Sequence, residues 1–361
     1  METHYLPRHK ERKILNAAEF LYHIGYSLKK RYALRHRRRL PHTVVSLGNI
    51  TVGGTGKTPA VIALAEEAKR RGYLPLVLTR GYRGRAHGPC FVAERKEGGA
   101  EVRKLLRDAP APPFCCTARE AGDEPALMAG RLPGVPIIKC ADRYAGGMFA
   151  LSSLAPDLHL PLLFLLDDGF QHWRLEREVD VVLVDGLDPY GNGRMLPAGS
   201  LRGPLNELRR AQLLVITKAR NEEVRKELER INPEAPVYFS GYRVKGVRNG
   251  KGEAVPGGML LGKRMYAFCG IARPESFIRT VESLGAQVCG VHSYRDHHRY
   301  TESDGAQLQR LGKEAGCDFL VTTEKDWVKL AEAPLPENLL CIEIEWAVDK
   351  EFYNDLFRRV S

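Results

Sequence analysis

The chain lacks the features that would place it in several common classes of protein. Its eight cysteines form no C-x-x-C pair and no spacing typical of a disulfide framework, which argues against a zinc ribbon and suits a reducing cytosol. We therefore expect all eight to be small buried hydrophobic residues. No apolar run reaches the length of a bilayer span, and no small-residue cleavage site follows a short apolar core, so neither a transmembrane helix nor a secretory signal is predicted.

Fixed-period repeats and low-complexity tracts are also absent. The 361 residues are 43% hydrophobic and 8% aromatic, which is the composition of a globular protein and excludes a disordered chain. This length is sufficient for two domains of ordinary size.

Positive charge is concentrated at the N-terminus. Residues 1–42 carry a balance of +8 out of the formal net charge of +11 for the whole chain. Apolar side chains recur there at helical spacing, with Tyr22 and Tyr26 beside them. The pattern predicts an amphipathic basic helix that lies on an anionic membrane surface. Its apolar positions are Ile14, Ala18, Leu21, Gly25, Leu28 and Tyr32.

Two other roles fit this basic helix. The run RHRRR at 35–39 would also suit a nucleic-acid backbone. Alternatively, the helix packs on the protein's own core and leaves a solvated basic rim. We favour the membrane surface and expect no nucleic-acid partner.

A glycine-rich segment between a predicted strand and a predicted helix has the pattern of a phosphate-binding loop. In LGNITVGGTGKTPA, residues 47–60, glycines let successive amides turn toward an anion, and the following helix adds its positive end. Lys57 can reach the β- and γ-phosphates of a nucleoside triphosphate, and the Thr58 hydroxyl can ligate Mg²⁺. The candidate phosphate-binding residues are Thr51, Val52, Gly53, Gly54, Thr55, Gly56, Lys57 and Thr58.

One position departs from the usual G-x-x-x-x-G-K-[ST] pattern of such loops. Thr51 stands where that pattern has its first glycine, although Gly48 and Asn49 lie just upstream. A glycine turn that only enters an ordinary helix is the alternative. The apolar strand before the loop and the apolar-periodic helix after it favour the phosphate loop.

Strand and helix patterns alternate along most of the chain, which predicts an α/β fold with a mostly parallel sheet flanked by helices. Apolar strands are expected at 74–79, 135–139, 161–166, 179–185 and 213–218, and one helix over 118–132. The alternation stops in a Gly/Pro-rich stretch and restarts near residue 265, which predicts a second, smaller α/β domain. The predicted division is a basic membrane-surface helix at 1–42, a P-loop core domain at 43–232, a linker or hairpin at 233–262 and a C-terminal domain at 263–361.

Two acids follow one of the apolar strands. Asp167 and Asp168 directly follow PLLFLL. At this place a nucleotide-binding sheet needs a carboxylate opposite the Thr58 hydroxyl to hold Mg²⁺. Gln171 and His172 come next, at the edge of the sheet where such folds bind ligands, and either could orient a hydroxyl. A simple turn for the acids and satisfied loop residues for the other two are the alternatives.

Several short motifs together resemble one family of enzymes. In chain order they are GNITVGGTGKTP, TRGYRGR, GDEP (122–125), DDGFQH (167–172), LPAGSLR (196–202), GIARPE (270–275), DHHRY (296–300) and TTEKDWVK (322–329). The series is similar to tetraacyldisaccharide 4′-kinase, the lipid A 4′-kinase of Gram-negative bacteria, over nearly the whole chain. The phosphate loop of that family also lacks the first glycine, so Thr51 fits the resemblance.

The resemblance implies a P-loop NTPase-type fold and a specific activity. That activity is ATP-dependent phosphorylation of the 4′-hydroxyl of a tetraacylated glucosamine disaccharide 1-phosphate in lipid A biosynthesis, with Mg²⁺. It also implies a peripheral enzyme on the cytoplasmic face of the bacterial inner membrane. The implied partner is the lipid disaccharide substrate, and no obligate protein partner is expected.

The resemblance also assigns catalytic roles. The family's catalytic Asp falls on Asp123, and its partner His falls on His297 from the second domain, so that the pair would assemble when the domains close. Lys57 and Asp168 complete the implied catalytic set. Without the resemblance, Asp123 could cap a helix that begins near Pro125, and His297 could be a strand-end histidine.

Arginines are expected beside these groups, because a diphosphate leaving group and a substrate phosphate both need fixed cations. Arg143 and Arg202 match arginines of the family's motifs, whereas many other arginines are surface groups. The candidate substrate and phosphate contacts are Arg80, Glu124, Arg143, Gln171, His172 and Arg202.

One position departs from the family. Related sequences usually read L-R-E-P where this chain has Leu201, Arg202, Gly203 and Pro204, so a glutamate is missing. We expect the chain either to do without that acid or to use Glu207 in its place.

A membrane-associated P-loop NTPase switch or chaperone is the alternative function. Guanine recognition by a GTPase requires [NT]-K-x-D after a late strand. ITKAR at 216–220 has Thr217 and Lys218 but places Arg220 where the aspartate should stand. The kinase is therefore the favoured prediction.

Overall fold

A computed structural model describes residues 9–93, 98–107, 113–115, 117–156, 158–330 and 336–360, with the backbone alone for 9–14 and 98–100. The chain forms two compact units. The first unit contains Met1–Val61, Leu162–Gly241 and Val348–Ser361, and the second contains Ile62–Pro161 and Tyr242–Ala347. Each unit therefore combines segments that are far apart in the sequence. The predicted domain boundaries, at 1–42, 43–232, 233–262 and 263–361, stay a prediction.

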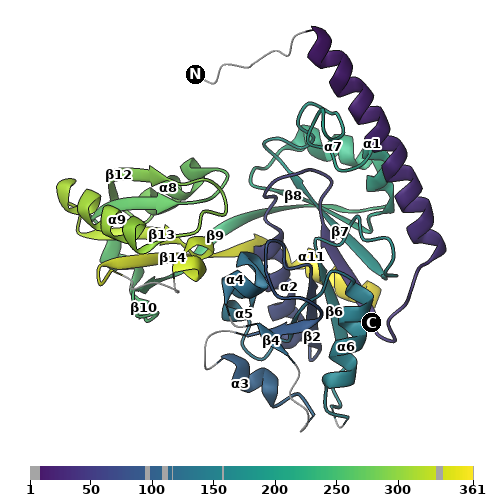
Figure 1. Cartoon of the computed structure of the whole chain (residues 1–361), viewed down its shortest axis with the longest axis horizontal. Coiled ribbons are helices and arrows are strands. Elements are labelled where there is room, and N and C mark those ends of the chain that lie inside the picture. The colour runs from purple at the N-terminus through teal and green to yellow at the C-terminus, as the bar shows by residue number, and fades with distance from the viewer. Residues whose placement is uncertain are drawn as a thin grey trace. The chain divides into compact units, whose positions relative to one another are not determined.

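The first unit is built on a parallel sheet of apolar strands (Figure 1). β1 (Thr43–Gly48) lies between β6 (Leu162–Asp167) and β7 (Val179–Asp185), β8 (Leu213–Thr217) pairs with β7, and the start of β9 (Val237–Asn249) pairs with β8. These strands confirm the apolar runs predicted at 161–166, 179–185 and 213–218. Because parallel strands end at the same edge, the polar residues that follow β1 and β6 lie together.

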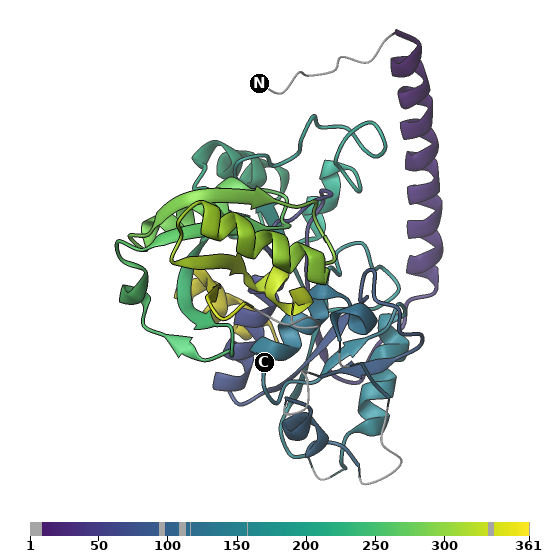
Figure 2. The same cartoon turned by 60° about the vertical axis from the view of Figure 1, so that its left-hand side comes forward.

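Helices complete the first unit. α1 (His9–Arg35) is one uninterrupted helix, as its apolar spacing predicts (Figure 2). α2 (Lys57–Arg70) begins directly after the phosphate loop, as predicted, and its residues after Val61 belong to the second unit. α7 (Glu222–Ile231) is capped by the Asn221 side chain. The remaining helices are the short 3-10 helix η1 (Leu205–Arg210) and α11 (Lys350–Val360), which contacts β7 and was not predicted.

The N-terminal part of the second unit forms a small mixed sheet. β2 (Leu74–Thr79) and β5 (Ile137–Lys139) are parallel, β3 (Cys90–Val92) runs antiparallel to β5, and β4 (Phe114–Cys115) is parallel to β3. The helices of this part are α3 (Gly98–Arg103), α4 (Ala118–Ala121), α5 (Asp123–Arg131) and α6 (Arg143–Ser153).

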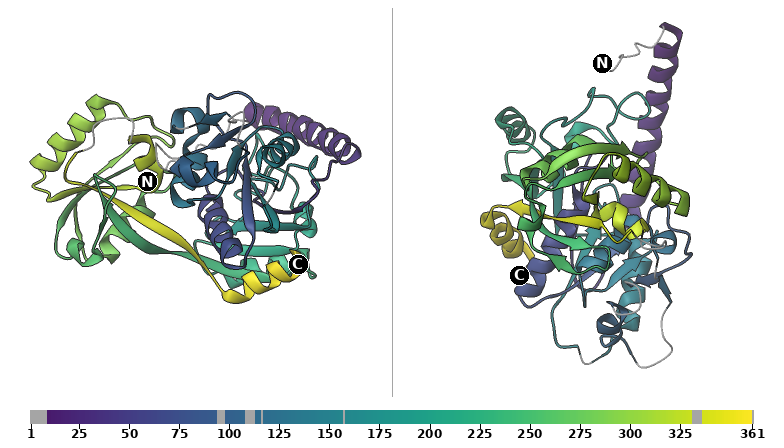
Figure 3. Two further views of the ribbon diagram at one scale, coloured as in Figure 1. Left: turned by 90° about the horizontal axis from the view of Figure 1, so that it is seen from below. Right: turned by 90° about the vertical axis from the view of Figure 1, so that its left-hand side faces the viewer.

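The C-terminal part of the second unit has the strand and helix alternation that the sequence predicts. β11 (Arg264–Cys269) lies between β12 (Gln287–Ser293) and β13 (Phe319–Thr323), and β13 pairs with β14 (Leu339–Val348); all run parallel. Figure 3 shows β14 as the yellow strand that leads into α11. The other elements here are β10 (Ala254–Val255), η2 (Gly257–Leu260), α8 (Pro274–Ser283), α9 (Glu302–Glu314) and α10 (Glu324–Leu330).

Two disulfides in the second unit contradict the expectation that all eight cysteines are free. The bonded pairs are Cys90–Cys115 and Cys289–Cys317. Their partners are 25 and 28 residues apart in the sequence, and the first pair meets only because β3 and β4 are neighbouring strands. The expectation is confirmed for the free, buried cysteines Cys140, Cys269 and Cys341, and Cys116 lies outside the described residues.

Candidate active site

The predicted phosphate loop lies where β1 ends and α2 begins, in the first unit. Gly53 and Gly56 have φ angles of +119° and +84°, which favour glycine. A Cβ added to Gly53 or Gly54 would meet no atom within 4 Å, so the loop is open at these positions. An open glycine loop at a helix N-terminus is what a backbone cradle for phosphate requires.

The LPAGSLR segment pairs with the first half of this loop. The Val52 amide donates to the Ser200 carbonyl at 2.7 Å, and the Arg202 amide donates to the Ile50 carbonyl at 2.7 Å. Thr51 lies between these two bonds and is buried. The Val52 amide is therefore already used, and the later amides of the loop are the ones open to a phosphate.

Asn49 is a buried residue that was not among the predicted site residues. Its side-chain amide donates to the Thr51 carbonyl at 2.9 Å, and its Oδ1 accepts from Lys57 Nζ at 3.2 Å. Its own carbonyl accepts from Gln171 Nε2 at 2.7 Å. Gln171 is thus engaged in holding the loop, which corresponds to the satisfied loop residue considered as an alternative. The available signal was the place of Asn49 between a buried strand and the glycines.

The Asp168 carboxylate lies between two cationic side chains. Its carboxylate oxygens accept from Arg202 Nη1 at 2.9 and 2.8 Å, and Lys57 Nζ lies 3.5 Å from Oδ1. Asp168 has a φ angle of +49°, which is uncommon for a residue other than glycine. Such conformations persist only where the surrounding structure over-determines them, and they cluster at active sites. Three predicted site residues therefore meet at one point.

The loop that carries Asp168 approaches the end of β1 closely. A Cβ on Gly48 would lie 2.5 Å from the Cβ of Phe170. The Gly169 amide donates to the Leu47 carbonyl at 2.9 Å. Only glycine at position 48 leaves room for this approach, so Gly48 helps to set the place of Asp168.

The oxygen donors around Asp168 fit Mg²⁺. The Thr58 hydroxyl lies in the first turn of α2, and the Asp167 and Asp168 carboxylates lie at the end of β6. Hydroxyl and carboxylate oxygens are the ligands that Mg²⁺ takes beside phosphate oxygens and water. His172 follows in the same loop, where it is half-buried and its amide donates to the Gly169 carbonyl at 2.8 Å.

The end of β8 supports the phosphate loop from another side. The buried Thr217 hydroxyl donates to the Thr55 carbonyl at 3.2 Å. Lys218 has a φ angle of +68°, and its Nζ lies 2.5 Å from Asp185 Oδ2. Both residues of the incomplete guanine-reading pattern thus have structural contacts within the protein.

The second unit brings Asp123 and His297 into contact. His297 Nδ1 lies 2.9 Å from Asp123 Oδ2, and the two side chains are 20% and 18% exposed. His297 Nε2 lies 3.8 Å from Asp296 Oδ2, and the His297 φ angle is +63°. With Asp123 ionised, the Nδ1–H of His297 donates to it. Both residues belong to the second compact unit, and the closing of domains expected from the sequence stays a prediction.

Asp123 has its position because of a break in the helix predicted over 118–132. The structure has two helices there, α4 and α5, separated by Gly122 with a φ angle of +102°. A Cβ on Gly122 would lie 2.7 Å from the Tyr82 carbonyl oxygen, so only glycine fits. Asp123 is therefore the first residue of α5 and not the side-chain cap of a later helix. Glu124 follows it in the same turn, half-buried.

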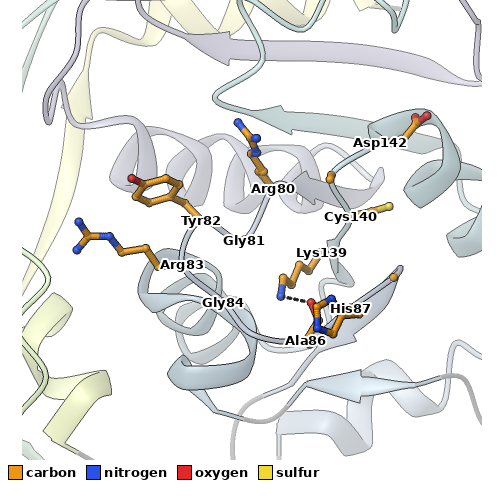
Figure 4. A pocket seen from close by; sticks show the side chains of 12 residues that line it. Arg80, Gly81, Tyr82, Arg83, Gly84, Ala86, His87, Lys139, Cys140 and Asp142 are labelled. Atoms are coloured by element: carbon orange, nitrogen blue, oxygen red, sulfur yellow. Dashed lines mark hydrogen bonds between the residues drawn. The ribbon is translucent and has the colours of Figure 1, made fainter.

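A cavity of about 440 Å³ lies in the second unit, and Figure 4 shows residues that line it. Tyr82 lines it, and the Tyr82 ring lies 6.3 Å from the His297 ring. Lys139 is buried and donates to the Ala86 and Glu120 carbonyls at 2.7 and 2.8 Å. Burial lowers the pKa of Lys139. The charged residues of the lining are Arg80, Arg83, Lys139 and Asp142.

The one acid in this lining is engaged elsewhere. Asp142 caps α6 by accepting from the Tyr144 and Ala145 amides at 3.0 and 3.2 Å. Arg143, the first residue of α6, is buried and its Nη1 donates to the Ala141 carbonyl at 3.0 Å. The cavity is therefore cationic in balance.

A family model described as tetraacyldisaccharide-1-P 4'-kinase matches residues 12–361. The chain belongs to this family. A tetraacyldisaccharide 4'-kinase from Syntrophus aciditrophicus is 37% identical over 358 residues, which cover 94% of this chain and 90% of the relative. The tetraacyldisaccharide 4'-kinase from Geobacter metallireducens is 38% identical over 299 residues, which cover 81% of this chain and 80% of the relative.

A solved structure gives the same result. The "apo" form of LpxK from Aquifex aeolicus in complex with ATP matches with a TM-score of 0.72 and 29% identity, and the match covers 97% of this chain and 99% of that one. Membership of the tetraacyldisaccharide 4'-kinase family confirms the predicted class of enzyme, a kinase of lipid A biosynthesis that uses ATP. The predicted P-loop α/β fold is confirmed as well.

The position where this kinase departs from its family lies against α1. A Cβ on Gly203 would lie 2.5 Å from the Tyr26 hydroxyl oxygen. Glu207, expected as a possible substitute acid, is buried and forms ion pairs with Lys30 and with Arg210, the latter at 3.0 Å. Glu207 thus joins α1 to the core, and its carboxylate is not at the Asp168 cluster.

α1 of the kinase has two different sides. Tyr26 and Ala33 are buried against the first unit, and Tyr26 packs edge-on against Trp173 with ring centroids 5.0 Å apart. The packing alternative is therefore correct for this side. In the part of the chain that the structure describes, no helix is both long and apolar enough to cross a membrane. The large apolar side chains left exposed on α1 are Phe20, Leu21, Ile24, Leu28, Tyr32 and Leu34.

Proposed function

We propose that this kinase transfers the γ-phosphoryl group of ATP to the 4′-hydroxyl of a tetraacylated glucosamine disaccharide 1-phosphate. The observation that carries the proposal is the hydrogen bond between Asp123 and His297 at 2.9 Å. An alcohol acceptor benefits from a base for its proton, whereas an NTPase switch only has to orient a water molecule. A switch or chaperone would leave this pair without a purpose.

The first unit binds ATP in this proposal. The amides after Val52 and the N-terminus of α2 bind the phosphate oxygens, and Lys57 lies against the β- and γ-phosphates. Arg202 supplies a second cation for the charge that develops on the leaving diphosphate. Mg²⁺, when bound, neutralises phosphate charge, and Thr58 with Asp167 or Asp168 would hold it.

Asp123 is the base in this proposal. His297 Nδ1–H holds carboxylate oxygen Oδ2 at 2.9 Å, which leaves Oδ1 to accept the proton of the acceptor hydroxyl. As the new P–O bond forms, that proton passes to Asp123 and ADP leaves with the electron pair of the broken bond. His297 acts by holding the Asp123 carboxylate in a fixed orientation through this hydrogen bond.

The cationic cavity takes the phosphate that the substrate already carries. Arg80 and the buried Lys139 line it, and Asp142 is committed to α6. Lys139→Met is expected to raise the KM for the lipid about tenfold, the size of a lost charge-assisted contact, with no change in the KM for ATP. Arg119→Met, which removes an exposed cation of the same region, is the control. An unchanged lipid KM in Lys139→Met would remove the cavity from the site.

α1 binds the membrane surface at the cytoplasmic face of the inner membrane. Its exposed Leu21 and Leu28 supply apolar contact, and each exposed Lys or Arg near an anionic leaflet adds about 1 kcal/mol. Replacement of both leucines by Asn is expected to weaken binding to phosphatidylglycerol-containing vesicles, and wild-type binding is expected to weaken at high salt. Ser27→Asn on the same helix is the control. Equal vesicle binding by all three proteins would make α1 purely structural.

One incubation tests the reaction itself. The purified protein is mixed with Mg²⁺ and ATP labelled in the γ-phosphate, together with the lipid disaccharide 1-phosphate, a soluble sugar or buffer alone. Label on the lipid only, at the 4′ position, is expected. Label that appears only as inorganic phosphate would instead support the NTPase alternative.

A further inference from the structure

α1 contacts one short segment of the first unit through its inner side. Glu19 accepts from Arg194 Nε at 2.9 Å and from the Met195 amide at 2.7 Å. The Tyr22 hydroxyl donates to the Arg202 carbonyl at 3.1 Å. Burial raises the pKa of the Tyr22 phenol, so it keeps its proton at neutral pH. Glu19 and Tyr22, about one turn apart on α1, thus face residues 194–202.

The same segment forms part of the phosphate loop's support. The Arg202 amide donates to the Ile50 carbonyl at 2.7 Å, and its guanidinium reaches Asp168 at 2.8 Å. The main chain of Arg202 is therefore held on both sides, by the loop at its amide and by Tyr22 at its carbonyl. The position of the Arg202 guanidinium beside Asp168 therefore depends on where the main chain of Arg202 is fixed.

The residue after Arg202 is adapted to this helix. The Tyr26 hydroxyl oxygen lies 2.5 Å from where a Cβ of Gly203 would stand, so the tyrosine uses the space that any larger residue would need. Lys30, one turn further along α1, pairs with the buried Glu207. Where related sequences have a glutamate, this chain thus has a glycine, and Tyr26 from α1 occupies the space beside it.

We propose that Tyr22 and Tyr26 are positioning residues for Arg202, so that α1 helps to set the geometry of the nucleotide site. This inference rests on the proposed role of Arg202 beside the nucleotide. It assigns α1 a second task that is separate from its exposed apolar side. Neither tyrosine touches the reacting atoms, and both act through the main chain of residues 202 and 203.

Tyr22→Phe isolates the hydrogen bond because it removes one oxygen and keeps the ring. We expect kcat to fall about three- to tenfold, which corresponds to one hydrogen bond, while the lipid KM and vesicle binding stay at wild-type values. Ser27→Ala is the matched control, since it also removes one hydroxyl, from an exposed residue of the same helix. That control should leave kcat unchanged.

A double-mutant cycle separates positioning from general stability. In an Arg202→Ala background, Tyr22→Phe should cause no further loss of ATP affinity or of kcat, because the guanidinium that it positions is gone. Equal losses from Tyr22→Phe in the two backgrounds, or no loss from it in the wild-type background, would overturn the inference. If Arg202→Ala itself kept full ATP affinity and turnover, the proposed role of Arg202 would fail instead.

Discussion

The nucleotide site of the first unit and the carboxylate–imidazole pair of the second are built in different ways. The first depends on main-chain contacts: the Val52 and Arg202 amides donate to the Ser200 and Ile50 carbonyls. The Asn49 side chain donates to the Thr51 carbonyl, and the Asn49 carbonyl accepts from Gln171. The second depends on one contact between two side chains, Asp123 and His297. At the Asp123–His297 pair, the backbone contributes by orienting these two side chains.

This difference has a practical meaning for substitutions. A change in the first unit should alter how ATP is held, because the main chain there is the proposed binding surface. A change at the pair in the second unit should alter the chemical step and leave ATP binding intact. The five predictions below begin with the largest expected effect. Those at Lys57 and Asp168, Asp123 and Gly48 test that separation, and the other two test how α5 and α1 are held.

Lys57→Ala and Asp168→Ala should each lower turnover by about 10³-fold, since each removes a charged group beside the transferred phosphoryl group. ATP affinity should fall as well. Turnover is measured by transfer of labelled phosphate to the lipid, and affinity by calorimetry with a non-hydrolysable ATP analogue. Wild-type ATP affinity in both variants would break the comparison at the nucleotide site.

Asp123→Asn should lower kcat by about 10²–10⁴-fold, because an amide cannot take the hydroxyl proton. The ATP affinity of this variant should equal that of the wild type. The amide keeps the shape of the side chain, so any change in folding is small. Full turnover in Asp123→Asn would remove the base assignment.

Arg131→Met should lower the free energy of unfolding by about 3–5 kcal/mol, because it leaves a buried carboxylate unpaired. Arg131 on α5 and Glu324 on α10 are 6% and 11% exposed and lie 2.5 Å apart. The double variant Arg131→Met with Glu324→Leu should recover most of this loss. Chemical denaturation measures both. A single variant as stable as the wild type would show that α5 is held without this pair.

Gly48→Ala should lower the free energy of unfolding by about 1–3 kcal/mol, because its Cβ would lie 2.5 Å from the Cβ of Phe170. ATP affinity should fall too, since the loop that carries Asp168 must move. Gly54→Ala is the control for stability, because a Cβ there meets no atom within 4 Å. Equal stability of the two variants would contradict the close approach.

The smallest effect concerns pH. The hydrogen bond from Arg194 lowers the pKa of Glu19 from its ordinary value of 4.5. A lowered folded pKa means that the contribution of Glu19 to stability is complete above 4.5 and is lost as the pH falls through the lower folded value. Trp173, which contacts Tyr26 on α1, is the fluorescence probe. Glu19→Gln should remove this acid-dependent difference; an identical acid profile in the variant would contradict it.

Sequence patterns predicted the parts of this enzyme that depend on local order. Buried parallel strands are continuous apolar runs, so β6, β7 and β8 could be found within a residue or two. The phosphate loop could be found because its glycines, Lys57 and Thr58 are consecutive. The short helix α11 carries no such marker and was missed.

Contacts between distant segments could not be predicted in the same way. The hydrogen bond from Gln171 to the Asn49 carbonyl joins residues 122 positions apart, and the sequence around Asn49 does not predict this partner. The break at Gly122 depends on the Tyr82 carbonyl, and the two disulfides depend on which strands and turns come together. The side of α1 that faces the core was set by its partners and not by its apolar stripe.

The left-handed main chain at His297 limits which replacements of this residue can be interpreted. Most residues with a Cβ resist a φ angle of +63°, whereas Asn adopts it readily. An alanine at this position would therefore remove the imidazole and also disturb the turn that presents it. An asparagine would remove the imidazole and preserve the turn. His297→Asn is therefore the better choice for an inactive variant of this enzyme.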